Sequence, residues 1–142
     1  MGAQASGLDA CQLSFYADEI AQVHALGTSL AIVIGGGNIY RGARTALDIP
    51  RVKGDTMGML ATVINGLALQ SALEKQGITA QVMSSLPKEA VTETYTPDRA
   101  LQHLEKNRLI IIVGGLGLPY FTTDSAASLR AIELGADVLL KG

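Results

Sequence analysis

Cysteine, tryptophan and charge are all scarce in this 142-residue sequence. The single cysteine, Cys11, excludes an internal disulfide and a cysteine-rich zinc site, so we expect a reduced thiol on a helix face. The two histidines, His24 and His103, are far apart and lack the spacing of metal ligands, so we expect both at the surface. The sequence therefore gives no indication of a metal site built from protein side chains.

Charged residues make up only 17% of the chain, with 11 basic against 13 acidic residues. This balance lacks the basic footprint of a nucleic-acid-binding domain. The uninterrupted apolar runs are too short to span a bilayer. The N-terminal region also lacks the basic flank and apolar core of a signal peptide. We therefore expect a cytoplasmic protein with neither nucleic acid nor membrane among its partners.

Apolar residues, 48% of the chain, follow two different patterns in turn. Helical spacing predicts helices over residues 9–26, 55–76, 97–107 and 123–134. Short continuous apolar runs predict strands over residues 29–34, 78–83, 109–113 and 136–140. The segments 42–54 and 86–97 lack either pattern and are predicted as irregular. Alternating helices and strands favour a three-layer α/β/α fold with a mainly parallel sheet. Because the chain starts with a helix and stops at a strand, we expect a domain truncated at both ends.

The stretch IVIGGGNIYRG places three consecutive glycines, Gly35–Gly37, at the end of a predicted strand. Glycine lets a ligand approach the backbone closely, and bare amides at a strand end can point at phosphate oxygens. A tight turn would need one glycine rather than three, and Arg41 follows with a guanidinium that can bind phosphate through two donors. We therefore predict a phosphate-binding loop. It is not a Walker loop, because GxxxxGKS/T is absent, and it is not a dinucleotide fingerprint, because Tyr40 stands where that pattern needs glycine.

A second glycine-rich loop, GGLGLPYFTTD, follows the predicted strand 109–113 and should open on the same edge of the sheet. Thr123 and Asp124 stand where a helix begins, so a simple N-cap explains them equally well. Asp55 has the same alternative explanation at the start of the longest predicted helix. An aspartate can also accept hydrogen bonds from both hydroxyls of a ribose. Spacing alone does not decide between these roles.

The predicted helix over residues 55–76 is apolar almost all round as far as Gln70. A helix of this kind is buried on more than one side. Its large apolar residues cannot all face one sheet; they are Met57, Met59, Leu60, Val63, Ile64, Leu67 and Leu69. Either a second layer of the same chain covers the outer face, or that face forms a subunit interface.

Three motifs taken together resemble those of the bacterial uridylate (UMP) kinases of the amino-acid-kinase superfamily. They are VIGGGNIYRG, KGDTMGMLATVINGLALQSAL and LPYFTTDSAASLRAIELGADVLLKG, in the family's order and over nearly the whole chain. One glycine loop would be a weak match, but the combination of GGGN, GDxMGMLAT and PYFTTD is specific. The resemblance implies transfer of the γ-phosphoryl group of ATP to UMP, with Mg²⁺, giving UDP and ADP in pyrimidine nucleotide biosynthesis.

The resemblance also implies roles for individual residues. Gly36 would lie against the UMP phosphate, and Gly37 against the ATP phosphates. Arg41 would stabilise charge near the transferring group, Asp55 would hold the UMP ribose, and Asp124 would help to organise the catalytic centre. The segment that would wrap uracil and sugar consists of Leu116, Gly117, Leu118, Pro119, Tyr120, Phe121, Thr122 and Thr123.

Members of this family are hexameric, activated by GTP and inhibited by UTP, and the resemblance implies that the helix Asp55–Gln70 contributes to contacts between subunits. Three departures stand out. Leu116 and Leu118 replace a threonine and an asparagine of many relatives, so base recognition would rest on backbone groups. The family's first strand, with a lysine-x-serine-glycine motif, and its C-terminal adenine-nucleotide region are missing. We therefore expect residues 1–142 to form one partial domain that holds mostly the UMP side.

Two alternative readings keep part of the same pattern. A related kinase that acts on carbamate or on an acyl group such as acetylglutamate would keep the sheet and the glycine loop. Such a kinase would not be expected to combine GDTMGMLAT with PYFTTD. The second alternative is a non-catalytic fragment that binds a nucleotide or forms oligomers, and the missing lysine favours it.

Overall fold

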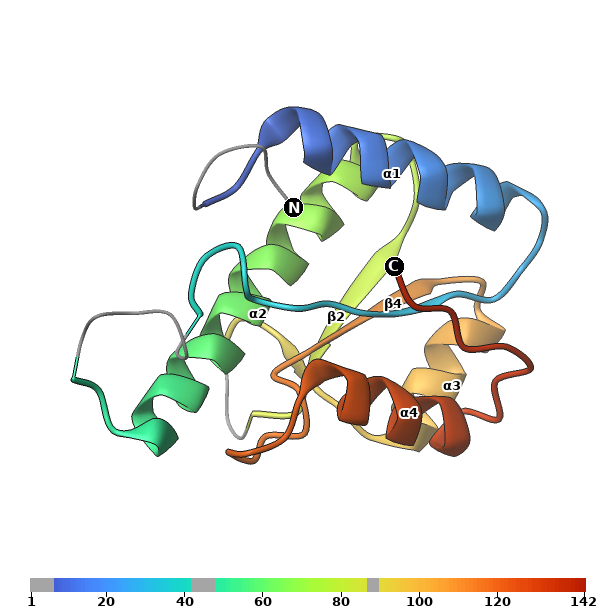
Figure 1. Cartoon of the computed structure of the whole chain (residues 1–142). Coiled ribbons are helices and arrows are strands. Elements are labelled where there is room, and N and C mark those ends of the chain that lie inside the picture. Colours follow the sequence, from blue (N-terminus) through green and yellow to red (C-terminus); the bar gives the residue numbers. More distant parts are fainter. Residues whose placement is uncertain (1–6, 42–47, 87–89) are drawn as a thin grey trace.

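The computed structural model describes residues 7–41, 48–86 and 90–142. Helices and strands alternate along the described chain, largely as the sequence predicts (Figure 1). The elements are α1 (Ala10–Ala25), β1 (Ala31–Val33), α2 (Arg51–Glu74), β2 (Ala80–Ser84), β3 (Glu93–Thr94), α3 (Pro97–Glu105), β4 (Leu109–Val113) and α4 (Thr123–Glu133).

The strands form one parallel sheet in the order β1–β4–β2–β3. β4 lies inside the sheet, and all of its residues are buried. Its Ile111 stands opposite Ile32 of β1 and Val82 of β2. A strand that is covered on both faces has no solvent-facing side, so its residues do not alternate between apolar and polar. The continuous run LIIIV therefore predicts this strand with its observed bounds.

Successive residues of β4 face different helical layers. Leu109, Ile111 and Val113 belong to a core cluster with residues of α1 and α2. Ile110 and Ile112 belong to a second cluster with residues of α3 and the residue that caps the end of α4. Figure 1 shows α1 and α2 on one side of the strands and α3 and α4 on the other. The predicted three-layer α/β/α fold with a parallel sheet is confirmed.

The largest correction concerns residues 136–140, which were expected to form a strand. Residues 136–142 have no regular structure, and Val138, Leu139 and Leu140 are exposed. Their apolar run matches a buried strand in composition, but a strand also needs a neighbour to satisfy its backbone groups. β1, at one edge of the described sheet, pairs with β4 on its inner side. The short strand β3 was missed, because two residues carry no periodic pattern.

Helix α2 begins at Arg51, four residues before the predicted start. The N–H of Gly54 donates to the carbonyl of Pro50 at 3.0 Å, which is the first bond of the helical repeat. Proline is tolerated at a helix start because the first N–H groups have no partner within the helix. Part of the predicted loop 42–54 is therefore helical, while residues 42–47 lie outside the described residues.

Helix α2 is also long and apolar enough, by length and composition, to cross a membrane, although the sequence contains no uninterrupted apolar run of that length. Its inner face packs into the core with β2 and β4. A Cβ added at Gly66 would lie 2.4 Å from Val113 Cγ1, so the helix backbone closely approaches the sheet. This packing is that of a core helix. Elsewhere, Cys11 is exposed on α1 as predicted, whereas both histidines are half-buried.

Candidate nucleotide-binding site

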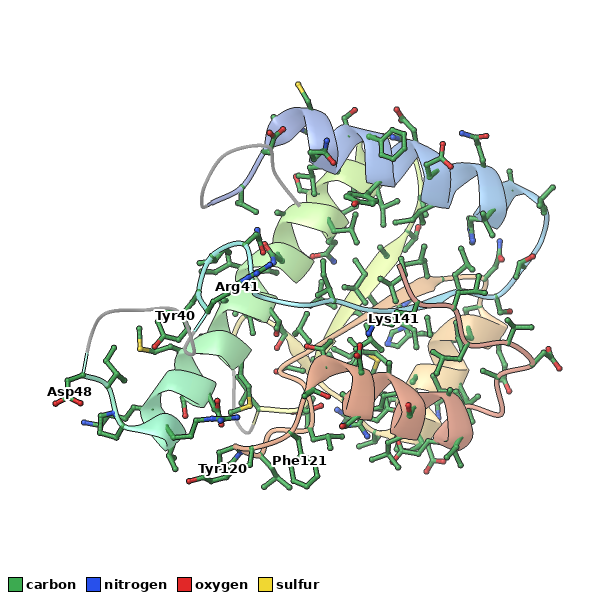
Figure 2. The ribbon with its side chains drawn as sticks, viewed as in Figure 1. Tyr40, Arg41, Asp48, Tyr120, Phe121 and Lys141 are labelled. Atoms are coloured by element: carbon green, nitrogen blue, oxygen red, sulfur yellow. The ribbon has the colours of Figure 1, made fainter. Side chains whose placement is uncertain are left out.

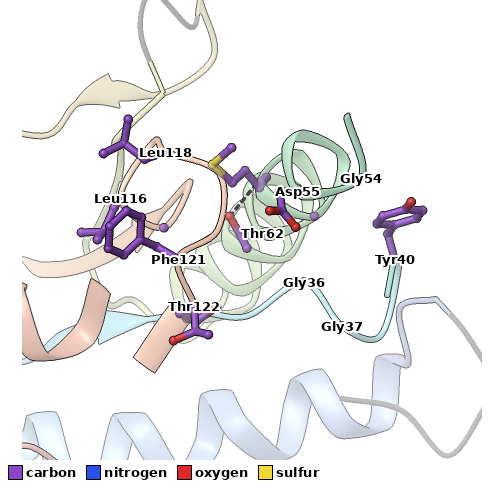
Figure 3. Close-up of a pocket in the computed structure, with 14 residues that line it drawn as sticks. Gly36, Gly37, Tyr40, Gly54, Asp55, Thr62, Leu116, Leu118, Phe121 and Thr122 are labelled. Carbon is purple, nitrogen blue, oxygen red and sulfur yellow. Dashed lines mark hydrogen bonds between the residues drawn. The ribbon is translucent and has the colours of Figure 1, made fainter. Parts of the chain in front are cut away.

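A cavity of about 370 Å³ lies where the turn after β1, the start of α2 and the loop after β4 meet (Figure 3). All three segments are at the carboxyl-terminal edge of the parallel sheet or beside it, where ligands of such sheets bind. Figure 3 shows the aromatic and leucine side chains of the loop after β4 on one side of the cavity. The glycine turn after β1, Gly35–Gly37, lies on the other side. The lining residues are Gly36, Gly37, Tyr40, Gly54, Asp55, Gly58, Met59, Thr62, Gly115, Leu116, Leu118, Phe121, Thr122 and Thr123.

The glycine turn packs directly on the backbone of α2. A Cβ at Gly36 would lie 2.6 Å from the carbonyl oxygen of Gly58 and 2.8 Å from Ala61 Cβ. None of Gly35–Gly37 has a positive φ, so close approach rather than unusual backbone geometry requires the glycine here. The expectation of close approach therefore holds for Gly36, but the observed neighbour is a helix of the same chain.

Two asparagines hold this turn in place. Asn65 of α2, fully buried, donates through Nδ2 to Asn38 Oδ1 at 2.6 Å and to the carbonyl of Gly35 at 2.7 Å. Asn38 donates in return to Asn65 Oδ1 at 3.1 Å and to the carbonyl of Gly7 at 3.0 Å. A buried amide pair of this kind leaves few polar atoms unsatisfied and fixes the turn relative to the helix.

Asp55 is not an N-cap, since it lies one turn inside α2 and the cap residue is Pro50. Its carboxylate accepts a hydrogen bond from the N–H of Tyr120 at 2.8 Å, and both of its oxygens accept from Arg51 Nε at 2.8 and 2.9 Å. The Tyr120 N–H, and to a lesser degree Arg51, holds the pKa of Asp55 below its usual range although burial acts in the opposite direction. Asp55 is therefore an ionised carboxylate at the cavity wall, available to accept further hydrogen bonds.

The loop after β4 owes its path to several residues in the left-handed region. Gly114, Gly115 and Gly117 have φ values of 77°, 57° and 72°, and Tyr120 has a φ of 69°. Only glycine adopts this region freely, so the tyrosine is held there by its hydrogen bond to Asp55. Figure 2 shows Tyr120 and Phe121 at the outer edge of the molecule, and both side chains are exposed.

A buried threonine links this loop to α2. Thr62 Oγ1 accepts a hydrogen bond from the N–H of Gly114 at 2.7 Å and donates to the carbonyl of Met59 at 2.7 Å. The carbonyl ends of β1 and β4 are thus both tied to the same helix, the first through Asn65 and the second through Thr62. The cavity floor is one connected hydrogen-bonded unit.

Helix α4 begins beside the cavity, with Thr122 as its N-cap rather than Thr123 or Asp124. Thr122 Oγ1 accepts from the N–H of Ser125 at 3.1 Å, while Thr122 and Thr123 both line the cavity. Asp124 stands in the first turn and pairs with Lys141 Nζ at 2.6 Å, on the exposed side of the helix. The N-terminal end of a helix favours negative charge, which suits a phosphate at this position as well as Asp124.

Arg41 bends back over the glycine turn. Its Nε donates to the carbonyl of Gly37 at 2.8 Å, and the side chain lies beside the turn in Figure 2. The remaining predicted site residues divide into two groups. Those that line the cavity are Gly36, Gly37, Asp55, Leu116, Leu118, Phe121, Thr122 and Thr123. Those that do not line it are Arg41, Gly117, Pro119, Tyr120 and Asp124.

Sequence reasoning missed several lining residues. Tyr40 was read only as the residue that breaks a dinucleotide fingerprint, and Met59 and Thr62 only as part of an apolar helix. Gly54 and Gly58 belong to the first turns of α2, which face the cavity because the helix begins early. The spacing of Gly54, Gly58 and Thr62 on one helical face was the signal that could have identified them.

The cavity combines phosphate-binding and base-binding features. Glycine backbone and threonine hydroxyls provide small hydrogen-bonding groups, and Leu116, Leu118 and Phe121 provide an apolar wall. In the described part of the chain, no three His, Cys, Asp or Glu side chains gather into a metal site. Mg²⁺ in phosphoryl-transfer sites is usually held by one or two carboxylates together with substrate phosphates, and Asp55 and Asp124 are of that chemistry.

Curated relatives of this chain include several uridylate kinases. The uridylate kinase of Dichelobacter nodosus is 52% identical over 99% of this chain, and that of Campylobacter curvus is 52% identical over 95%. The matched regions are 59% and 58% of those proteins, so the chain spans less than two thirds of the length of the curated relatives it matches.

Solved structures give the same result for the fold. The UMP kinase from Bacillus anthracis is 39% identical with a TM-score of 0.90, and the crystal structure of UMP kinase from Ureaplasma parvum is 37% identical with a TM-score of 0.85. The likeness covers 95% and 90% of this chain, and 56% of each of those chains. The model of the amino acid kinase family matches residues 3–142. The chain therefore belongs to the amino acid kinase family.

Proposed function

We propose that this chain carries the acceptor side of a UMP kinase, which transfers the γ-phosphoryl group of ATP to UMP. The observation that carries the proposal is the convergence of Gly36, Asp55 and the 115–123 loop on one cavity, in a chain 52% identical to uridylate kinases. Residues 1–142 then act as one partial domain, with the UMP site at the carboxyl edge of its sheet.

In this proposal each wall of the cavity binds a different part of UMP. The phosphate lies against Gly36, the ribose hydroxyls donate to Asp55, and uracil lies between Leu116, Leu118 and Phe121. The ionised state of Asp55 supports the ribose role, because a carboxylate can accept from two hydroxyls while keeping its bond to Tyr120. Backbone groups from Gly117 to Thr123 select the base, since the two leucines offer no polar contact.

The donor nucleotide, ATP, approaches from the Gly37 side. In this proposal Arg41, whose Nε donates to the carbonyl of Gly37, neutralises charge on the transferring group. Phosphoryl transfer needs chiefly positioning and electrostatic stabilisation from the protein, and glycine amides with an arginine supply both. Mg²⁺ would neutralise phosphate charge when bound with ATP, and Asp124 is the carboxylate best suited to organise that region.

The acyl-group and carbamate alternatives receive no support from the cavity. A small acceptor would leave much of a 370 Å³ cavity with its leucine and phenylalanine wall unfilled. Uridylate kinase is also the name of the curated relatives. The non-catalytic alternative makes a different prediction, namely nucleotide binding without turnover.

We also infer that the protein forms a homo-oligomer through α2. Leu60 and Ile64 are 49% and 48% exposed on its outer face, next to Met57. These residues are one and two turns apart and form a single apolar row. The row supports a subunit contact of the kind that the family resemblance implies for the helix Asp55–Gln70. A cytoplasmic location fits a kinase that uses ATP.

Calorimetric titration of the 142-residue chain with UMP, and with CMP as a control, tests the proposal. Binding of UMP without binding of CMP is the expected result, and Asp55→Ala should weaken it. A folded chain that binds neither nucleotide contradicts the acceptor-site assignment. Release of UDP and ADP from ATP and UMP, measured on the same sample, then separates the kinase from a fragment that only binds nucleotide.

A further inference from the structure

A buried arginine of α4 is linked by hydrogen bonds to the loop that lines the cavity. Arg130 of α4 is 8% exposed, although its side chain carries a permanent charge. Its Nη1 donates to Glu133 Oε2 at 2.7 Å, and its guanidinium carbon lies 4.1 Å from the centre of the Tyr95 ring. Tyr95 in turn donates through its hydroxyl to Glu133 Oε2 at 2.9 Å. One side of the guanidinium therefore contacts α4 and the residue after β3, while its buried Nε has no hydrogen-bond partner among the described residues.

The other side of the guanidinium points toward the cavity loop. Arg130 Nη2 donates to Ser85 Oγ at 2.9 Å, and Ser85 Oγ donates to the carbonyl of Gly115 at 2.8 Å. Because Ser85 has a single hydroxyl proton, accepting from Arg130 leaves that proton for Gly115. The direction of the chain is thus fixed from the arginine through the serine to the loop.

Ser85 also limits where the loop can run. Its N–H donates to the carbonyl of Val113 at 3.1 Å, and its own carbonyl oxygen lies 2.5 Å from where a Cβ of Gly117 would stand. Gly115 and Gly117 flank Leu116, whose side chain lines the cavity. With glycines on both sides, that leucine has little intrinsic conformational preference to hold it. The restraint comes from a turn bond inside the loop, from the N–H of Gly117 to the carbonyl of Gly114 at 2.8 Å, and from the external bond of Ser85 to Gly115.

We propose that Arg130, acting through Ser85, is a positioning residue that holds the Gly115–Gly117 segment in the shape that receives the acceptor base. The proposal rests on the function proposed above for its ligand, UMP. Arg130 touches no part of the cavity itself. Its charge polarises the Ser85 hydroxyl and so strengthens the bond to the Gly115 carbonyl. The buried Tyr95–Glu133 contacts keep the guanidinium from turning to solvent.

The test uses Ser85→Ala and Arg130→Met in the full 142-residue chain, with Tyr95→Phe as the matched control. Tyr95→Phe removes one hydrogen bond at the far end of the cluster and keeps the ring under Arg130. Amide hydrogen exchange of the 114–121 segment is compared with that of β4, which reports global opening. Loss of a hydrogen bond with a charged donor should speed exchange in the 114–121 segment roughly tenfold in the first two variants. The exchange rate of β4 should not rise by the same factor. Tyr95→Phe should leave the exchange rate of the 114–121 segment unchanged.

The double variant distinguishes a relay from general destabilisation. If Arg130 acts through Ser85, then Arg130→Met adds nothing to loop exchange in the Ser85→Ala background. UMP affinity, measured by calorimetry, should fall about tenfold in each single variant and no further in the double variant. If Arg130→Met does not fold, Arg130→Lys replaces it, and unchanged loop exchange in Ser85→Ala still overturns the relay, because the only path from Arg130 to Gly115 in the proposal runs through the Ser85 hydroxyl.

Equal loop exchange in all variants overturns the relay, even where UMP binds normally. Faster loop exchange with unchanged UMP affinity overturns its role in shaping the acceptor site. If the unsubstituted chain does not bind UMP, the proposed function fails. The exchange data then still test whether Arg130 and Ser85 restrain the loop, because that measurement needs no ligand.

Discussion

At the scale of single residues, the carboxylate of Asp55 joins two walls of the cavity. It belongs to α2, yet it accepts a hydrogen bond from the N–H of Tyr120 in the loop after β4. Tyr120 has a positive φ, a conformation that costs free energy for a residue with a side chain. The bond to Asp55 offsets that cost. One ionised carboxylate thus stabilises a strained loop and lines the cavity.

This arrangement predicts a pH-dependent stability. The folded-state pKa of Asp55 is lowered from 3.8, so its contribution is fully present above that value and is lost as pH falls through the lower, folded-state pKa. Asp55→Ala should reduce the free energy of unfolding by about 1 kcal/mol at pH 7, the usual net value of a hydrogen bond. The difference from the unsubstituted chain should shrink below pH 3.8.

Urea unfolding between pH 3 and pH 7 provides the measurement. Asp137→Ala, a change at an exposed aspartate in the C-terminal segment, is the matched control. A constant difference across the whole range would show that Asp55 stabilises the chain by packing rather than through its charge.

At the scale of elements, the glycine turn is built into α2 rather than set apart from it. Gly36 contacts the helix backbone, and the Asn38–Asn65 pair locks the turn from the side. Turn and helix should therefore respond to substitution as one unit. A methyl group placed between them has to separate backbone from backbone, which costs more than displacing a flexible side chain.

Gly36→Ala is predicted to destabilise the chain by about 1–3 kcal/mol, the usual cost of overpacking. Gly35→Ala is the matched control in the same turn, because its added Cβ meets only Thr123 Oγ1, at 4.0 Å. Thermal unfolding of both variants measures the difference. If the two variants are equally stable, a methyl group at Gly36 costs no more than one at Gly35. That result would contradict the close packing of Gly36 on α2.

The elements also show how far sequence reasoning reaches. Local patterns predict β4 and the helices well, because burial on both faces or on one stripe leaves a periodic trace. The Gly36 contact could not be predicted, since its partners lie on another element and glycine reads equally as a ligand contact. The bond between Thr62 and Gly114 could not be predicted for the same reason, because its partner lies on another element. The run VLL at 138–140 misled the prediction because strand formation depends on a neighbouring strand.

At the scale of the whole molecule, α2 has more apolar surface than the described residues cover. Its inner face meets β2 and β4, while Leu60 and Ile64 remain about half exposed on the outer face. Contiguous exposed apolar residues on one helix face commonly mark a contact with another protein chain. A second copy brings the same row, so the contact can be self-complementary about a two-fold axis.

A paired Leu60→Glu and Ile64→Glu variant should therefore shift the chain to a smaller species in sedimentation experiments. Two carboxylates on each facing helix would bring like charges together and would lose their hydration at the contact. Ile132→Glu, at a 78% exposed position on α4, is the control and should leave the sedimenting mass unchanged. An unsubstituted chain that sediments at its own 14.8 kDa would contradict self-association through α2. A shift in both variants alike would place the contact elsewhere.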